Sequence, residues 1–158
     1  MLKITPFLWF DTQAEEAANL YVSIFPNSKL TDVSRYTGAG PGPAGSAMTV
    51  QIELDGLPVT LLNGGPVFRP TEAFSFSVTC EDQAEVDRYW AALTADGGEE
   101  SQCGWLKDRF GFSWQIVPRA LSEVLSNPDR AKAKRAMEAM FQMKKLDIAK
   151  LREAAEAA

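Results

Sequence analysis

The sequence has 158 residues, of which 46% are hydrophobic and 23% charged, and this composition suits a compact globular chain. A net charge of −5 argues against general nucleic-acid binding, and the absence of histidine excludes Ser-His and Cys-His catalysis as well as His-based metal sites. No apolar run is long enough to span a bilayer and no signal peptide is recognisable, so we expect a cytoplasmic protein without a membrane partner.

The first half of the chain predicts one strand, one helix and three further strands. Residues 4–10 are apolar on both strand faces, which is typical of a central strand. A helix is expected from Asp11 or Thr12 to about Phe25, because Thr12 and Glu15 have the spacing of a capping box. Three more strands are expected at 29–37, 48–54 and 59–63.

A loop rich in glycine and proline occupies residues 38–45. Its glycines do not form a phosphate-binding pattern, because a strand and not a helix follows. The composition favours a disordered connector, and a lid over a ligand is the alternative.

The second half repeats the order of the first. A strand is expected at 73–80, a helix from Glu81 to about Ala95, a short strand ending at Gln102 and another at 105–108. A hairpin turn then leads into a last strand that Pro118 ends.

The last strand presents two different faces. Phe112, Trp114 and Ile116 point to one side, which is apolar and predicts packing against a helix. On the other side lies Gln115, between Ser113 and Val117. We interpret this side as the wall of a cavity, with an amide satisfied by neighbouring backbone as the alternative.

The two halves are an internal repeat. The segments 12–15 and 82–85 are similar, and matching the turn glycines Gly56 and Gly111 aligns Thr60 with Gln115. The prediction is an α+β fold of two βαβββ modules, at about 1–65 and 72–118, whose sheets form half-barrels in a single domain over 1–158.

A helical tail is expected over 119–158. Asn127 and Pro128 have the pattern of a helix start, and Asp147 is expected to cap a last helix. The apolar side of the first of these helices is predicted to carry Ala133, Met137, Met140 and Phe141. Residues 129–158 carry eight Lys/Arg against five Asp/Glu, so this tail is cationic on an acidic body.

Several motifs of this sequence occur together in one known family. They are Pro6-Phe7-Leu8-Trp9-Phe10-Asp11, Ile24-Phe25-Pro26-Asn27-Ser28, Leu61-Leu62-Asn63-Gly64-Gly65, Cys103-Gly104-Trp105-Leu106-Lys107-Asp108 and Gly111-Phe112-Ser113-Trp114-Gln115-Ile116-Val117-Pro118. With them the chain resembles the PhnB-like branch of the vicinal oxygen chelate superfamily (glyoxalase/bleomycin resistance), often labelled "3-demethylubiquinone-9 3-methyltransferase" domains. The resemblance implies eight strands in two four-stranded half-barrels, usually paired into homodimers.

The resemblance also locates the metal-ligand positions of the superfamily. They correspond roughly to Pro6, Thr60, Phe76 and Gln115, of which only the glutamine has a ligating group, so no metal is expected. Methyl transfer is disfavoured as well, because the sequence lacks the glycine-rich strand-to-helix turn that holds adenosylmethionine. We therefore expect no cofactor.

The main functional hypothesis is a protein that binds a small organic molecule in a metal-free sheet cavity. The side chains that suit such a cavity are aromatic or carry an amide. They are Trp9, Tyr36, Asn63, Trp105 and Gln115.

Two other functions remain open. A metal-independent enzyme would use Cys103 as a nucleophile activated by Lys107 or Arg109, with Asp108 as a general base. A homodimeric regulatory module would use the cationic tail to contact a partner. The thiols Cys80 and Cys103 are expected to be free in either case.

Overall fold

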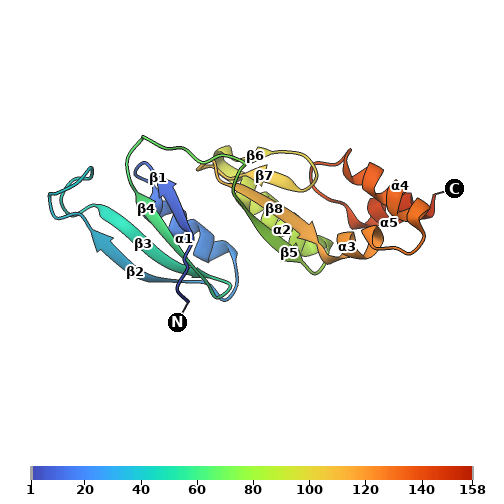
Figure 1. Cartoon of the computed structure of the whole chain (residues 1–158), viewed down its shortest axis with the longest axis horizontal. Helices are drawn as coiled ribbons and strands as arrows, with labels where there is room; N and C mark the ends of the chain where they lie inside the picture. The colour runs from blue at the N-terminus through green and yellow to red at the C-terminus, as the bar shows by residue number, and fades with distance from the viewer. Residues whose placement is uncertain (1, 158) are drawn as a thin grey trace. The chain divides into compact units, whose positions relative to one another are not determined.

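The computed structural model describes residues 2–157. The chain divides into two compact units, Met1–Pro70 and Thr71–Ala158, called unit 1 and unit 2 below. Each unit contains one four-stranded mixed sheet with helices, as Figure 1 shows. The predicted α+β class is confirmed, and both sheets are open in the part of the chain that the structure describes.

Unit 1 is a βαβββ module with strand order β1-β4-β3-β2. The outer strand β1 pairs in parallel with β4, whereas β3 is antiparallel to both of its neighbours, β4 and β2. Its elements are β1 (Phe7–Phe10), α1 (Ala14–Ile24), β2 (Lys29–Arg35), β3 (Ala47–Leu54) and β4 (Leu57–Asn63).

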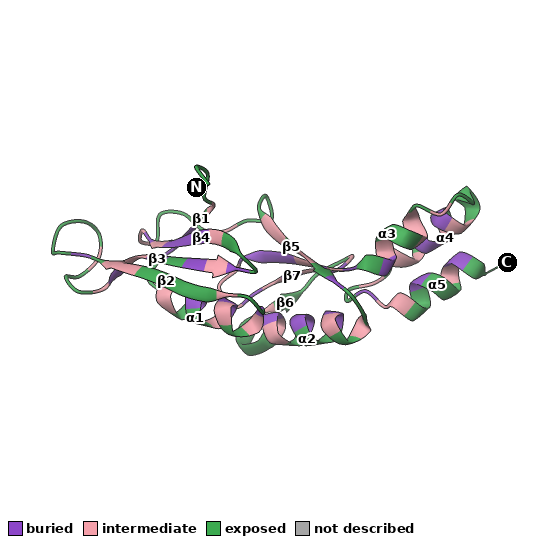
Figure 2. Ribbon diagram, turned by 90° about the horizontal axis from the view of Figure 1, so that it is seen from below, coloured by how far each residue is buried: buried purple, intermediate pink, exposed green. Residues whose placement is uncertain are grey.

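The core of unit 1 lies between α1 and one face of its sheet. Helix α1 buries Ala14, Ala17 and Ala18 completely, together with Tyr21. Small side chains along this face let the helix approach the strands closely, and Figure 2 shows buried positions on both. The strand side of this core is aliphatic and aromatic: Leu8, Phe10, Val50, Ile52, Val59 and Leu61.

Unit 2 has the same module followed by three helices. Its strand order is β5-β8-β7-β6, with β5 parallel to β8. The elements are β5 (Ser75–Cys80), α2 (Gln83–Thr94), the 3₁₀ turn η1 (Ala95–Gly97), β6 (Glu99–Glu100), β7 (Trp105–Lys107), β8 (Ser113–Pro118), α3 (Arg119–Leu125), α4 (Arg130–Met140) and α5 (Ile148–Glu156).

The predicted repeat is confirmed by strand register. Thr60 of β4 lies opposite Phe7 of β1, and Gln115 of β8 lies opposite Ser77 of β5. The alignment of Thr60 with Gln115 therefore holds in three dimensions. With Thr60 aligned to Gln115, the residue of β1 that corresponds to Ser77 of β5 is Phe7.

Two helix starts differ from the prediction. The capping box of Thr12 and Glu15 does not form, because α1 begins at Ala14 and its N-cap residue Gln13 makes no side-chain cap. The cap of α4 is Asp129, which accepts from the N–H groups of Ala131 and Lys132, so the helix begins after the Asn127–Pro128 pair. Asn127 instead accepts from the N–H of Asp129 in the turn before the helix.

The apolar side predicted for the tail is partly wrong. Ala133 is buried as predicted, together with Ala136, and Met140 is half-buried, whereas Met137 and Phe141 are 40% and 57% exposed. Helices α4 and α5 pack through these alanines, so the longer side chains on α4 project outward. The predicted cap of α5 is confirmed, since Asp147 accepts from the N–H of Lys150 at 3.0 Å.

Candidate functional site

Unit 1 contains a cavity of about 520 Å³ at the end of its sheet, called the end pocket below. It lies where β1 and β4 end, where α1 begins and where the loop between β2 and β3 folds back. Its lining residues are Asp11, Thr12, Glu15, Arg35, Tyr36, Pro41, Gly42, Pro43, Ser46, Ala47, Asn63, Gly64, Gly65, Pro66 and Val67.

Tyr36 organises the wall of the end pocket. Its hydroxyl donates to the carbonyl oxygen of Asn63 at 2.5 Å, which joins the end of β2 to the end of β4. Gly42 lies directly against the ring, since a Cβ added there would stand 2.3 Å from the ring carbons. The predicted site residues Tyr36 and Asn63 are thus brought together.

The loop over 38–45 is closed by backbone hydrogen bonds. The N–H of Gly45 donates to Tyr36 at 2.8 Å, and the N–H of Tyr36 donates to Ser46 at 2.9 Å. Pro41, Gly42 and Pro43 of this loop form one wall of the end pocket. The loop therefore lies beside the end pocket, where a lid over a ligand would lie, and it is called the cover loop below.

The Asn63 side chain is fully engaged in building the end pocket. Its Oδ1 accepts from the N–H of Ala14 at 2.8 Å, and its Nδ2 donates to the carbonyl of Ala47 at 3.0 Å. This amide caps α1 from the neighbouring strand, in place of the capping box. Its role in the described structure is to hold three elements around the pocket.

Three charged side chains line the end pocket, and sequence reasoning did not select them. Arg35 Nη2 lies 3.2 Å from Glu15, and its Nη1 donates to the carbonyl of Gly45 at 3.3 Å. Asp11 makes no side-chain hydrogen bond or ion pair within residues 2–157 and is exposed. The position of Asp11 directly after a buried strand was the available signal.

Trp9 supports the end pocket from behind. Its indole N–H donates to the carbonyl of Gly65 at 2.8 Å, and its ring excludes any side chain at Gly64, where a Cβ would lie 2.3 Å away. The edge of the ring also packs against Phe68 at 5.0 Å between centroids. Trp9 thus fixes the turn that lines the pocket without being a lining residue itself.

The other two predicted ligand residues lie together in unit 2. Trp105 of β7 is directly opposite Gln115 of β8 on the face of the sheet away from α2. The Gln115 amide donates to the hydroxyl of Ser75 at 2.9 Å, so a side chain and not backbone satisfies it. On this face the Ser113 hydroxyl is buried and has no partner within the described residues.

Phe76 and Gln115, which correspond roughly to metal-ligand positions of the superfamily, lie on opposite faces of the sheet. Phe76 pairs with Trp114, and their rings pack at 4.8 Å on the opposite face of the sheet. A one-residue shift along a strand reverses the face, so the neighbours of Gln115 are Ser75 and Ser77. One amide and two hydroxyls, those of Gln115, Ser75 and Ser77, are a poor ligand set for a divalent metal. Among residues 2–157 there is no cluster of three His, Cys, Asp or Glu that could hold a metal ion.

Asp108 is buried and shapes the hairpin before β8. Its Oδ1 accepts from the N–H groups of Phe110 and Phe112, and its Oδ2 accepts from the indole of Trp114 at 2.9 Å. A carboxylate with both oxygens engaged by fixed donors is suited to holding a turn. No substrate-sized cavity adjoins it among those described.

Neither cation predicted to activate Cys103 is free. Lys107 pairs with Glu72 at 2.5 Å, and this hydrogen bond raises the pKa of Lys107 and lowers that of Glu72. Arg109 pairs with Asp96 at 3.4 Å. Cys103 itself takes a left-handed backbone conformation, with φ of 57°, and its N–H donates to Met143 of the tail.

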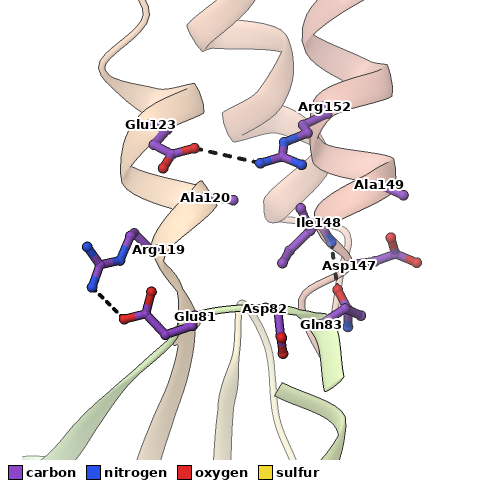
Figure 3. A pocket seen from close by; sticks show the side chains of 10 residues that line it. All are labelled: Glu81, Asp82, Gln83, Arg119, Ala120, Glu123, Asp147, Ile148, Ala149 and Arg152. Carbon is purple, nitrogen blue, oxygen red and sulfur yellow. Dashed lines mark hydrogen bonds and ion pairs between the residues drawn. The ribbon is translucent and has the colours of Figure 1, made fainter. Parts of the chain in front are cut away.

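A second cavity, of about 360 Å³, separates the start of α2 from the tail helices and is called the seam pocket. Figure 3 shows two ion pairs beside it, Arg119 with Glu81 and Arg152 with Glu123. Gln83 joins α2 to the tail, accepting from the N–H of Ile148 and donating to Leu146. The seam pocket is therefore lined by groups that already hold the tail in place.

The geometry defines the class of protein. Two βαβββ modules, each with an outer strand parallel to its neighbour, form the fold of the vicinal oxygen chelate (glyoxalase-like) superfamily. The family model described as 3-demethylubiquinone-9 3-methyltransferase matches residues 2–117. The chain belongs to this family, that of the PhnB-like proteins.

Solved structures agree with this assignment. A PhnB protein from Bacillus cereus, described as a putative 3-demethylubiquinone-9 3-methyltransferase, is 34% identical, with a TM-score of 0.68 over 74% of this chain and 99% of its own. A Pseudomonas aeruginosa protein is 22% identical, with a TM-score of 0.61 over 75% and 98%. The fosfomycin resistance protein FosX of Listeria monocytogenes is 18% identical, with a TM-score of 0.57 over 80% and 100%, which concerns the fold alone.

The family match ends before the tail. Residue 117 lies in β8, and the helices α3, α4 and α5 follow it. No curated protein matches the chain. No helix among residues 2–157 is long and apolar enough to cross a membrane.

Proposed function

We propose that this protein binds a small organic molecule in the end pocket of unit 1. The observation that carries the proposal is a cavity of about 520 Å³, within the range of known small-molecule sites, that is built by three elements and covered by a loop. Tyr36 and Asn63 fix its shape through hydrogen bonds that need no ligand. A pocket preformed in this way loses little conformational freedom on binding.

The composition of the end pocket suits an amphipathic ligand. Pro41, Pro43, Pro66 and Val67 offer apolar surface, while Asp11, Glu15 and Arg35 add charged side chains to the lining. Neither a metal nor adenosylmethionine is part of the proposal. The two four-stranded mixed sheets are not the doubly wound sheet of the usual methyltransferases, and no helix follows Gly64 and Gly65 to receive phosphate or cofactor.

The test is a fragment screen by thermal shift, with hits mapped by amide chemical shifts. Thr12→Trp fills the end pocket, and Ser23→Trp adds the same ring on an exposed part of α1 outside it. Hits are expected to bind wild type and Ser23→Trp and to lose binding to Thr12→Trp. Equal binding to all three proteins contradicts the proposal.

A second location for the small-molecule ligand, on the sheet of unit 2, is supported by the buried Ser113 hydroxyl, which has no hydrogen-bond partner within the described residues. A buried polar group without a hydrogen bond costs about 1–3 kcal/mol, so a ligand or water that reaches it gains a favourable contact. Trp105 and Gln115 flank it on the same face. Hits that shift the amides of β7 and β8, and not those around Tyr36, place the ligand there.

We propose in addition that the protein forms a homodimer. The family resemblance implies it, and unit 1 exposes large apolar side chains beside β1: Ile4 at 87%, Phe7 at 62% and Phe68 at 63%. A second copy of the chain would cover this surface. Sedimentation equilibrium of wild type and Phe7→Ser tests this, because a monomeric wild type contradicts it.

A further inference from the structure

We propose that the end pocket selects cationic ligands, namely small molecules that join a primary ammonium or guanidinium group to an apolar body. This inference rests on the proposed function and names the class of ligand. It follows from the charges that line the cavity and from which of them are already paired.

The only guanidinium in the end pocket is committed to the protein. Arg35 contacts Glu15 through Nη2 and the carbonyl of Gly45 through Nη1, so its two terminal nitrogens both hold the cover loop and α1. An incoming anion would have to compete with a carboxylate and a carbonyl for this group. Arg35 and Glu15 therefore cancel each other in charge.

Asp11 is the charge that remains. Its carboxylate lines the end pocket, and within residues 2–157 it has no side-chain hydrogen bond or ion pair. The three charged side chains of the lining thus sum to one negative charge, and the unpaired one is Asp11, directly after β1. A ligand cation placed there gains an ion pair without breaking one.

The rest of the lining suits the apolar body of such a ligand. Besides Asp11, the lining includes Pro41 and Pro43 of the cover loop and Pro66 and Val67 of the turn after β4. The Tyr36 hydroxyl and the Asn63 amide are satisfied within the protein and leave mainly carbon surface to the ligand. A single unpaired negative charge beside apolar surface suits a ligand that joins an ammonium group to an aromatic or aliphatic stem.

Three probes of nearly equal size separate the possible outcomes: benzylamine, benzyl alcohol and benzoate. Each is titrated into the full-length protein at pH 7 and followed by amide chemical shifts around the end pocket. Benzylamine is expected to bind about two- to fivefold more tightly than benzyl alcohol, as one partly exposed ion pair allows, and benzoate most weakly. The advantage of benzylamine is expected to shrink when salt is raised.

Variants assign the effect to Asp11. In Asp11→Asn the advantage of benzylamine over benzyl alcohol is expected to disappear, while benzyl alcohol binds as before. Asp32→Asn makes the same change of charge on an exposed position of β2 outside the pocket and is expected to keep the advantage. Arg35→Gln releases Glu15 and is expected to strengthen benzylamine binding further.

The possible failures are distinguishable. Tighter binding of benzoate, or a benzylamine advantage that survives Asp11→Asn, overturns the cationic class and leaves the end pocket as a binding site. If none of the three probes shifts the amides that line the end pocket, the proposed function is overturned together with this inference.

Discussion

The two modules share one sheet topology and differ at the ends of their sheets. Strand register makes Asn63 of β4 equivalent to Pro118 of β8. In unit 1 the asparagine reaches back to cap α1 and closes the end pocket, whereas in unit 2 the proline begins α3 and the helical tail. A duplicated unit thus keeps its strand order and diverges where strands end, which is where sheets commonly carry sites.

The helices show the same contrast. Helix α2 supplies its own cap, because Asp82 accepts from the N–H of Glu85 at 2.9 Å, while α1 depends on a side chain from β4. The connection between β2 and β3 is a long Gly/Pro loop that covers a cavity, and its counterpart in unit 2 is the short segment 101–104 between β6 and β7. We infer that unit 1 diverged toward binding and unit 2 toward holding the tail.

The largest effect is expected at Asp108 in the hairpin of unit 2. Asp108→Ala removes the buried carboxylate that accepts from the N–H of Phe112 and the indole of Trp114, so the free energy of unfolding should fall by about 3 kcal/mol or more. Glu53, an acidic residue just before the corresponding turn of unit 1, makes an exposed pair with Lys29, and Glu53→Ala should cost about 1 kcal/mol or less. Urea unfolding of both variants measures the difference, and similar losses would contradict the assignment of Asp108 to the turn.

The two helix caps should also be unequal. Asn63→Ala removes both the cap of α1 and the bond to Ala47, for an expected loss of about 2 kcal/mol, whereas Asp82→Ala removes one cap for about 1 kcal/mol. Asn63→Ala is further expected to weaken fragment binding in the end pocket. Equal losses and unchanged binding would show that the pocket does not depend on this cap.

A smaller effect is expected from Gly42→Ala in the cover loop. The new Cβ meets the Tyr36 ring and must displace the loop, which should reduce fragment affinity several-fold while changing the unfolding free energy by about 1 kcal/mol. Ala44→Gly alters the same loop without this contact and serves as the control. Unchanged affinity in Gly42→Ala would mean that the loop does not close the pocket.

The smallest effect concerns pH and Cys80 of unit 2. Burial, with the Glu85 carboxylate nearby, raises the pKa of this thiol to about 12. The folded chain keeps the proton when the unfolded chain loses it, so this contribution to stability is complete below about pH 9 and is lost as pH rises toward 12. Between pH 8 and 10 the wild type should lose about 1 kcal/mol more than Cys80→Ala does, and Cys103→Ala should behave like wild type. If the unfolding free energy of all three proteins depends on pH in the same way, the raised pKa of Cys80 is contradicted.

Much of the fold was predictable because its signals are local and repeated. Alternating strands, the two turn glycines and the Asp82 region specify both modules, and the parallel strand pairs follow from their equivalence. The cap from Asn63 to α1 was not predictable, since its partners are 49 residues apart. That Phe76 and Gln115 lie on opposite faces of their sheet was not predictable for a related reason, because the relative face depends on register between distant strands.

The site was predictable only in part. Aromatic and amide side chains were selected by type, and two of the five, Tyr36 and Asn63, line one cavity. The charges of the end pocket come from the end of β1, the first turn of α1 and the end of β2, segments that meet only in the folded chain. The position of Asp11 directly after a buried strand indicates a possible site residue, but the local sequences around Asp11, Glu15 and Arg35 do not indicate that the three side chains share a cavity.

A crystal structure of the full chain with a bound fragment hit tests the central claim most directly. We predict electron density in the end pocket of unit 1, in contact with Tyr36 and the loop residues 41–43, with the charged end of a cationic fragment at Asp11. Density only on the face of unit 2 that carries Ser113 and Gln115, with the end pocket empty at saturating fragment, would contradict it.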